Sequence, residues 1–288
     1  MTPEFLVIGH AAQDMREDGT WQLGGAVAYA SALANNLGLR TAALTSASPD
    51  VDFETLLPGV ECHVVPSPES TRFHNTYDSA RRRQRVSTRA EPITADDLPP
   101  AWRDAPIVLL GPLVGELDDA LAEAFPDALI GIGAQGWLRE IGPDTMVRPV
   151  EPQRWDEGLL LEHSDALFLS DEDIPADSAG EAIDRWLKSV GLIAFTHGDR
   201  GADVYTGSER RHIDAFPASV VDLTGAGDVF AAAFLICLHE TNDVSEATRF
   251  AACAASFVVE GEGVAGIPTR AQIGARLRAN PEIVARLR

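Results

Sequence analysis

The 288-residue sequence contains a single lysine, Lys188, and its other basic residues are arginines. A Walker-A phosphate loop, which needs a lysine directly after its glycines, is therefore excluded. The three cysteines are widely spaced and lie in apolar runs such as the one around Cys237, so we expect buried thiols and a reducing compartment. No apolar run reaches the ~18 residues that cross a bilayer, and no cationic stretch precedes the short apolar run at the N-terminus. We expect a cytoplasmic protein.

Basic side chains are also scarce relative to acidic ones: 23 basic residues stand against 44 acidic residues, which gives a net charge of −21. A surface of this sign repels phosphate backbones and anionic lipids, so we expect neither nucleic acid nor a membrane as a partner. The seven histidines show no His-Glu-x-x-His spacing, and no Gly-x-Ser-x-Gly elbow is present. A zinc peptidase and a serine hydrolase are therefore disfavoured.

Short aliphatic runs alternate with longer amphipathic stretches, the pattern of a mainly parallel sheet covered by helices. The runs predict strands at residues 5–8, 41–44, 107–110, 129–132, 166–169 and 192–196. The stretches between them predict helices at residues 25–37, 116–124, 154–163 and 179–189. After residue 226 the pattern predicts helices only, at 226–239, at 244–259 and in two short C-terminal segments. The sequence thus predicts an α/β fold.

One segment, residues 71–92, breaks this rhythm by alternating polar and apolar side chains on both sides of a polar tip, which predicts a hairpin. With a strand at about 20–23 it would form a small sheet that projects from the main sheet and closes over substrate. The arginine-rich tip, Arg81 to Arg85, has three interpretations. They are a solvated tip, a contact to an anionic substrate or nucleotide, and a nucleic-acid patch, which the net charge disfavours.

The most informative stretch is Thr224-Gly225-Ala226-Gly227-Asp228, which leads into an apolar helix. Small residues before a helix leave its free N–H groups uncovered, and these groups form an anion site with the positive end of the helix dipole. A carboxylate beside this site could accept a proton from an attacking hydroxyl while the amides hold a transferred phosphoryl group. The alternative is structural: Thr224 caps the helix, Asp228 complements the dipole and the glycines turn the chain.

The stretch also resembles the C-terminal signature of the ribokinase-like (PfkB) carbohydrate kinases, and four further motifs follow the order of that family. Gly9 to Asp14 resembles the first strand with its sugar-binding aspartate, and Gly24 to Gly38 resembles the Gly-Gly signature. Thr196 to Gly201 is similar to the nucleotide loop, and Gly261 to Pro268 to the adenine-side loop. The resemblance implies a three-layer α/β/α fold with a small β lid, in a single domain spanning residues 1–288 whose lid elements lie at about 14–23 and 71–92.

The resemblance further implies an ATP-dependent kinase that uses Mg²⁺ and phosphorylates a hydroxyl of a small sugar or cyclitol. Asp228 would be the catalytic base, and the anion hole would come from Gly225, Ala226 and Gly227. The residues implied at the substrate are Asp14, Gly24, Gly25, Tyr29, Phe73, Asn75 and Gln135. Those implied at the nucleotide are Ser170, Thr196, Gly198, Gly201 and Gly263, with Asp173 at the metal.

The chain departs from the family pattern at three places. Ser170-Asp-Glu-Asp173 stands where the family has Asn-x-x-Glu, and its alternative interpretation is a solvated loop and helix cap. Tyr29 replaces an asparagine of ribokinases, and Pro112 falls near their substrate-binding glutamate, which argues against ribose. Tyr29, the Gln135 to Arg139 stretch and Tyr77-Asp78 are more similar to the inositol kinase branch. The alternatives kept open are a catalytically weak ligand-binding or regulatory member of this fold and a nucleoside kinase; a monomer and a homodimer are equally compatible with the sequence.

Overall fold

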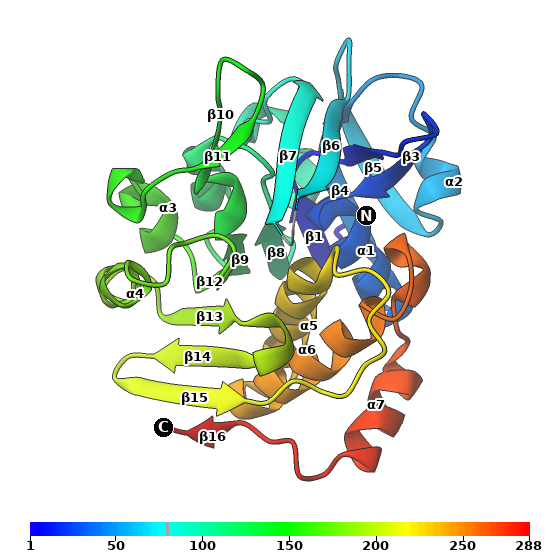
Figure 1. Cartoon of the computed structure of the whole chain (residues 1–288). Helices are drawn as coiled ribbons and strands as arrows, with labels where there is room; N and C mark the ends of the chain where they lie inside the picture. The colour runs from blue at the N-terminus through cyan, green and yellow to red at the C-terminus, as the bar shows by residue number, and fades with distance from the viewer. Residues whose placement is uncertain (79–80) are drawn as a thin grey trace.

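The computed structural model describes residues 1–78 and 81–288, so the hairpin tip at 79–80, and the side chains of residues 77, 78, 81 and 82, lie outside the described part. Ten strands form one sheet (Figure 1). In spatial order they are β5 (Val60–Pro66), β4 (Thr41–Ala47), β1 (Phe5–Ile8), β8 (Ile107–Leu110), β9 (Leu129–Gly133), β12 (Ala166–Ser170), β13 (Leu192–Thr196), β14 (Ala202–Thr206), β15 (Glu209–Ile213) and β16 (Arg286–Leu287). The first seven run parallel, and β14 to β16 are added antiparallel.

The central strands are apolar throughout because both of their faces are covered. In β1, Phe5 and Val7 point into one hydrophobic cluster, whereas Leu6 and Ile8 point into another. Successive side chains of a strand point to opposite faces, so an uninterrupted apolar run supplies both layers. The sheet thereby separates two cores.

The first core lies under the helices α1 (Ala26–Asn36), α5 (Ala226–Thr241) and α6 (Val244–Val258), which lie together on one side of the sheet (Figure 1). The second lies under α3 (Gly158–Glu162) and α4 (Ala179–Trp186) and several short 3₁₀ turns. The remaining helices are α2 (Phe53–Leu56) and α7 (Arg270–Ala279). The predicted three-layer α/β/α architecture is confirmed. Among the described residues, no helix combines the length and apolarity required to span a membrane.

A separate four-stranded sheet, with the order β3 (Trp21–Gly24), β2 (Ala12–Met15), β6 (Thr71–Asp78) and β7 (Arg81–Thr88), stands at one end of the main sheet (Figure 1). The predicted hairpin supplies β6 and β7. A two-stranded ribbon of β10 (Arg139–Ile141) and β11 (Val147–Pro149) lies beside β7. The small sheet thus begins directly after β1, at the end of the main sheet where β1 finishes.

Three predicted helices are clearly shorter in the structure, and one of them, predicted at 179–189, ends as α4 at Trp186. The segment 116–124 forms only a 3₁₀ turn, Asp119–Ala124, because the buried Glu116 side chain accepts hydrogen bonds from the backbone N–H groups of His10, Leu113 and Val114 and keeps its start in a loop. The segment 154–163 contains only the short helix α3, which begins at a glycine. The expectation of three buried thiols holds for Cys237 and Cys253, whereas Cys62 is half-buried in the edge strand β5. All three are free.

Candidate active site

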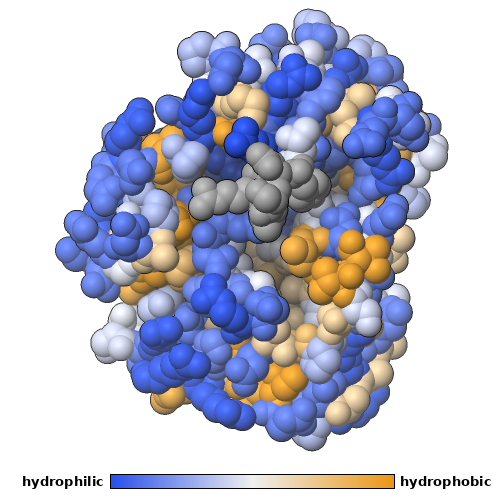
Figure 2. Space-filling view, in the orientation of Figure 1, coloured by the Kyte–Doolittle hydropathy of each residue, from blue (hydrophilic) through white to orange (hydrophobic). Residues whose placement is uncertain are grey.

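The carboxyl ends of β1, β8, β9, β12 and β13 meet at one edge of the sheet, and a cavity of about 280 Å³ lies there. Parallel sheets place all such strand ends on the same side, which is where α/β proteins bind ligands. Figure 2 shows the hollow between the small sheet above and the main sheet below. An apolar patch borders it, over the loop before α5 that exposes Val220, Val221 and Leu223.

The N-terminus of α5 forms one wall of this cavity. Gly225, the residue before the helix, adopts a left-handed backbone conformation with φ of 82°, and Asp222 holds the preceding turn by accepting hydrogen bonds from the Thr224 N–H and hydroxyl. The structural alternative expected the Thr224 side chain to cap the helix, and the structure shows no such hydrogen bond. The first N–H groups of a helix have no partner within it, so Gly227 and Asp228 offer their amides to a ligand.

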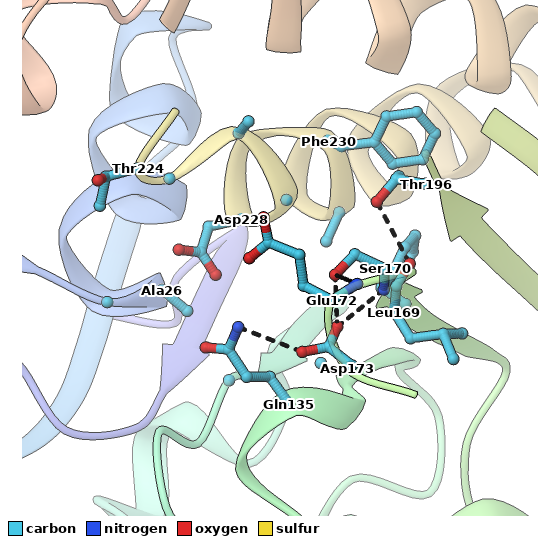
Figure 3. Close-up of a pocket in the computed structure, with 18 of the residues that line it drawn as sticks. Ala26, Gln135, Leu169, Ser170, Glu172, Asp173, Thr196, Thr224, Asp228 and Phe230 are labelled. Atoms are coloured by element: carbon cyan, nitrogen blue, oxygen red, sulfur yellow. Dashed lines mark hydrogen bonds between the residues drawn. The ribbon is translucent and has the colours of Figure 1, made fainter. Parts of the chain in front are cut away.

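Asp228 lies in the first turn of α5 and faces the cavity together with Glu172 and Asp173 (Figure 3). Desolvation by the surrounding protein, and then the nearby Asp173 carboxylate, raise the pKa of Asp228 to about 7, although Arg139 opposes the shift. A carboxyl group of this pKa exchanges its proton readily near neutral pH, as a general base must. The geometry and the pKa together suit proton abstraction from a hydroxyl.

Across the cavity, the small sheet contributes Asp14 from β2. Gly24 lies beside it, and any side chain there would collide with the Asp14 carboxylate, since an added Cβ would be 2.2 Å from Oδ2. The Asn75 side-chain amide donates a hydrogen bond of 3.2 Å to Asp14 Oδ1. Phe73 is buried and lines the cavity from the same strand as Asn75. A carboxylate and an amide near an aromatic side chain suit a polyhydroxylated ligand.

A chain of polar contacts joins Asp14 to the opposite wall. Gln84 of β7 donates to Asn75 Oδ1 at 3.0 Å, and Arg139 donates to Gln84 Oε1 at 3.1 Å. The same guanidinium lies 3.7 Å from Asp173 Oδ1. The chain therefore runs from the small sheet, through Gln84 and Arg139, to the loop after β12.

That loop presents the acidic cluster to the cavity. Asp173 is buried, and its Oδ2 accepts hydrogen bonds from the N–H and hydroxyl of Ser170 at 2.8 and 2.9 Å. Gln135 donates to its Oδ1 at 3.4 Å (Figure 3). Within residues 1–78 and 81–288, no group of three or more His, Cys, Asp or Glu side chains is close enough to cage a metal. Because Mg²⁺ keeps several waters, the Asp173 and Glu172 carboxylates fit a hydrated ion held through water.

Most of the residues singled out in the sequence come together here. The cavity wall contains Asp14, Gly25, Phe73, Gln135, Ser170, Asp173, Thr196, Gly198, Gly225, Ala226, Gly227 and Asp228. Gly24 and Asn75 lie behind it and contact Asp14.

The other three lie outside the cavity wall. Tyr29 is fully buried beneath Gly225. Gly201 lies against the backbone of Ile213, and Gly263 against the side chain of Gln22. These three residues support the walls or neighbouring loops and do not line the cavity.

Sequence reasoning did not single out Gln84 or Arg139 as site residues. Gln84 pairs with Asn75 in the hairpin, and the alternation of the hairpin was the signal that could have indicated that the two side chains share a face. Arg139 follows Gln135 by four residues, after a 3₁₀ turn, Ala134–Gly136, that the pattern does not predict. Its reach to Asp173 became visible only in the structure.

Part of the chain is similar to a family of known proteins. The model of the pfkB family carbohydrate kinases matches residues 158–270, a segment that includes Ser170, Thr196 and Asp228. This segment is similar to the pfkB family carbohydrate kinases. The chain is 44% identical to the ribokinase of Bacillus subtilis (strain 168) over 80 residues, which are 27% of each protein. The matched segment therefore covers about a quarter of the length of this curated relative.

Solved structures of family members agree with the fold over nearly the whole chain. One is a pyrophosphate-dependent kinase in the ribokinase family complexed with a pyrophosphate analog and myo-inositol, with a TM-score of 0.78, 23% identity and coverage of 94% of this chain and 99% of the other. Another is the Arabidopsis thaliana ribokinase complexed with ribose and ATP, with a TM-score of 0.73, 23% identity and coverage of 96% and 99%. The similarity of fold therefore extends beyond the segment that the family model matches.

Proposed function

We propose that this protein is a kinase that transfers the terminal phosphoryl group of ATP to a hydroxyl of a small sugar or cyclitol. The observation that carries the proposal is the position of Asp228 at the N-terminus of α5, facing the same cavity as Asp14. A base with a pKa of about 7 lies beside the N–H groups at the start of α5. The residues that would bind the acceptor substrate come from the small sheet. This arrangement meets the two needs of phosphoryl transfer, positioning and charge stabilisation.

In the proposed reaction Asp14, which Asn75 positions through its hydrogen bond, holds the acceptor, and Asp228 takes the proton of the attacking hydroxyl. The amides at the start of α5 hold the charge on the transferred group. Ser170, Thr196 and Gly198 lie on the donor side. When bound, Mg²⁺ would supply neutralisation of the donor phosphates, and Asp173 and Glu172 would hold its water shell.

A second donor, pyrophosphate, is supported by one feature of the site. Gly201 and Gly263, which the family resemblance assigns along the nucleotide, lie outside the cavity wall, whereas Thr196–Gly198 and Leu223–Thr224 line it. A shorter donor fits this outline, and a structural relative is pyrophosphate-dependent.

The test is a screen of sugars, inositols and nucleosides with purified protein. ADP release that depends on the acceptor would support ATP as donor, and acceptor-dependent phosphate release from pyrophosphate would support the alternative. The Asp228→Asn variant is the matched control and should be inactive with either donor. If no acceptor stimulates either donor, while ligands still bind, a ligand-binding or regulatory member of the family becomes the better interpretation.

A further inference from the structure

A cluster of charged side chains lies behind the donor side of the cavity, and the steps proposed above do not use it. Its centre is Asp203 of β14, whose side chain is only 4% exposed. His197 Nε2 lies 3.0 Å from Asp203 Oδ2, and Arg210 donates to the same oxygen at 2.7 Å. His212 Nδ1 lies 2.9 Å from Oδ1. Burial alone would raise the pKa of Asp203, but the hydrogen bonds from Arg210 and the two histidines hold it below its usual value, so this carboxyl group is ionised at neutral pH.

His197 joins this cluster to the cavity. It belongs to the loop after β13, and within the described residues it is the member of the cluster that lines the cavity. Because Asp203 occupies Nε2, a singly protonated imidazole holds its proton there and leaves Nδ1 without one. Nδ1 lies 3.7 Å from Oδ2 of Asp171, another residue of the cavity wall. A second proton on Nδ1 would therefore place an N–H group and a positive charge at this wall.

Positive charge is scarce around the cavity, although a donor with several ionised phosphate oxygens needs it. Two basic side chains, Arg139 and His197, line the described wall, together with the five carboxylates of Asp14, Asp171, Glu172, Asp173 and Asp228. Arg139 is engaged on the acceptor side, where it donates to Gln84 and faces Asp173. His197 is thus the basic residue of the described wall that lies on the donor side, between Thr196 and Gly198.

The charged groups around His197 act in both directions on its second proton. Imidazole changes its charge near neutral pH, so its surroundings decide whether it carries one proton or two. The carboxylates of Asp171 and Asp203 favour the second proton. The basic groups that bind these two carboxylates oppose it, and they are Arg200, Arg210 and, when protonated, His212. The negative charges of a bound donor would add to the favourable side.

We propose that His197 is a donor-binding residue that takes up a proton from solvent when the donor phosphates bind. Its Nε2–H stays on Asp203, and the new Nδ1–H donates to a phosphate oxygen of the donor. This inference rests on the proposed function, because it concerns the donor side of the same site. It applies to ATP and to pyrophosphate alike, since both present ionised phosphate oxygens. Asp203 is then a positioning residue, which touches no ligand and holds the imidazole ring in place.

The test is a count of protons on donor binding. ATP and pyrophosphate, each with excess Mg²⁺ to keep the phosphates ionised, are titrated calorimetrically at about pH 7.5 in buffers of different ionisation enthalpy. The change of the binding heat with the buffer gives the number of protons taken up. The Asp228→Asn protein is used, because it should not turn over and because Asp228 could itself take up a proton. We expect an uptake of roughly half to one proton per donor bound.

His197→Gln in this background should abolish the uptake and weaken donor binding about tenfold, as the loss of a charge-assisted hydrogen bond does. The donor affinity of the parent should fall as pH rises from about 6 to about 8.5, because binding that takes up a proton weakens when protons become scarce. The affinity of His197→Gln should stay constant over this range. His197→Asn, a second variant that cannot titrate, should behave in the same way, and Asp203→Asn should reduce the uptake in part.

The matched control is His212→Gln, which removes the other histidine bound to Asp203 and lies outside the described cavity wall. It should keep the uptake. Donor binding without proton uptake, or uptake that survives both His197 variants, would overturn the inference while the kinase proposal stands. Uptake that is lost equally in His212→Gln would assign the proton to the cluster around Asp203 and would also overturn it.

The binding data also separate this inference from the proposed function. Uptake that depends on His197 would support the inference even if the wild type turned over no acceptor, a result that would count against the kinase alone. Failure of both donors to bind would overturn the donor assignment and the inference together.

Discussion

The aromatic ring of Tyr29 lies directly against Gly225, the residue that begins the anion site of α5. A Cβ added at position 225 would be 2.2 Å from Tyr29 Cδ1, which is far inside van der Waals contact. Tyr29 is fully buried, so the ring has little freedom to move away. The substitution of tyrosine in the Gly-Gly signature thus supports the turn at Gly225 from below.

Gly225→Ala should therefore destabilise the protein and reduce its activity together. The steric clash adds to the cost of a non-glycine residue at φ of 82°, so we expect a loss of about 2–4 kcal/mol in the free energy of unfolding. Denaturant unfolding measures it. The matched control is Gly227→Ala, where an added Cβ meets nothing within 4 Å; its stability should be unchanged or slightly higher. Equal stability of the two variants would contradict this account of Tyr29.

Asp228→Asn should abolish phosphoryl transfer and preserve ligand binding. The amide keeps the shape of the carboxyl group but accepts no proton, and loss of a general base typically costs ~10²–10⁴ in rate. Donor and acceptor affinities should stay within about tenfold of wild type. Turnover is measured by product release and affinity by calorimetry. A variant that retains more than half of wild-type turnover would exclude Asp228 as the base.

The raised pKa of Asp228 also predicts how stability depends on pH. The folded protein holds this proton up to about pH 7, whereas the unfolded chain releases it near the ordinary value of 3.8. Between these values the folded state binds more protons, so the contribution of Asp228 to stability falls as pH rises and is lowest above pH 7. Asp228→Asn should therefore match wild type at pH 4 and exceed it at pH 8, by on the order of 1–4 kcal/mol.

Thermal unfolding of both proteins across this range, without metal or nucleotide, measures the difference. The pH dependence of the wild-type rate should reflect the ionisation of Asp228, because only the ionised carboxylate accepts a proton. Its kcat/KM should rise tenfold per pH unit below about pH 7 and then level. A stability difference that is constant with pH would contradict the shifted pKa.

Asp173→Ala should raise the magnesium concentration needed for half-maximal rate and lower turnover, and it should leave acceptor affinity without nucleotide nearly unchanged. The physical reason is that donor phosphates need cationic neutralisation while the chain has no lysine at this site. A magnesium titration at saturating substrates compares the variant with wild type and with Asp127→Ala, which alters an exposed carboxylate elsewhere. Superimposable curves for Asp173→Ala and wild type would contradict a role of Asp173 at the metal and would favour the interpretation of residues 170–173 as a solvated loop.

The main sheet and its long helices were predictable because burial on two faces leaves a simple apolar signature. Residues 226–239 and 244–259 were expected as helices and form α5 and α6 with nearly the same bounds. Edge strands were not predictable in this way. β5 alternates half-buried and exposed side chains over few residues, and β15 is mostly charged, so their pairing depends on neighbours that local sequence does not reveal.

Within the site, the sequence identified residues that belong to a motif. It could not predict the positions of residues that contact the site only through tertiary packing. Asp14 and Asp228, about 200 residues apart in sequence, face one cavity as expected for strand and helix ends on one edge. Tyr29 belongs to a motif, yet its ring packs beneath the site because the direction of a helical side chain depends on tertiary packing. Arg139 and Gln84 meet only because the β10–β11 ribbon lies beside β7.

The chain of contacts from Asp14 to Asp173 has a consequence for how new specificities could arise. The residues of the small sheet that we propose for the acceptor all precede residue 90, and the loops that we propose for the donor all follow residue 165. One recombination crossover between them would exchange the first set and leave the second intact. The two halves meet in this chain at the hydrogen bond from Arg139 to Gln84. A chimera that keeps this pair would inherit a foreign acceptor site already joined to the native phosphoryl-transfer apparatus.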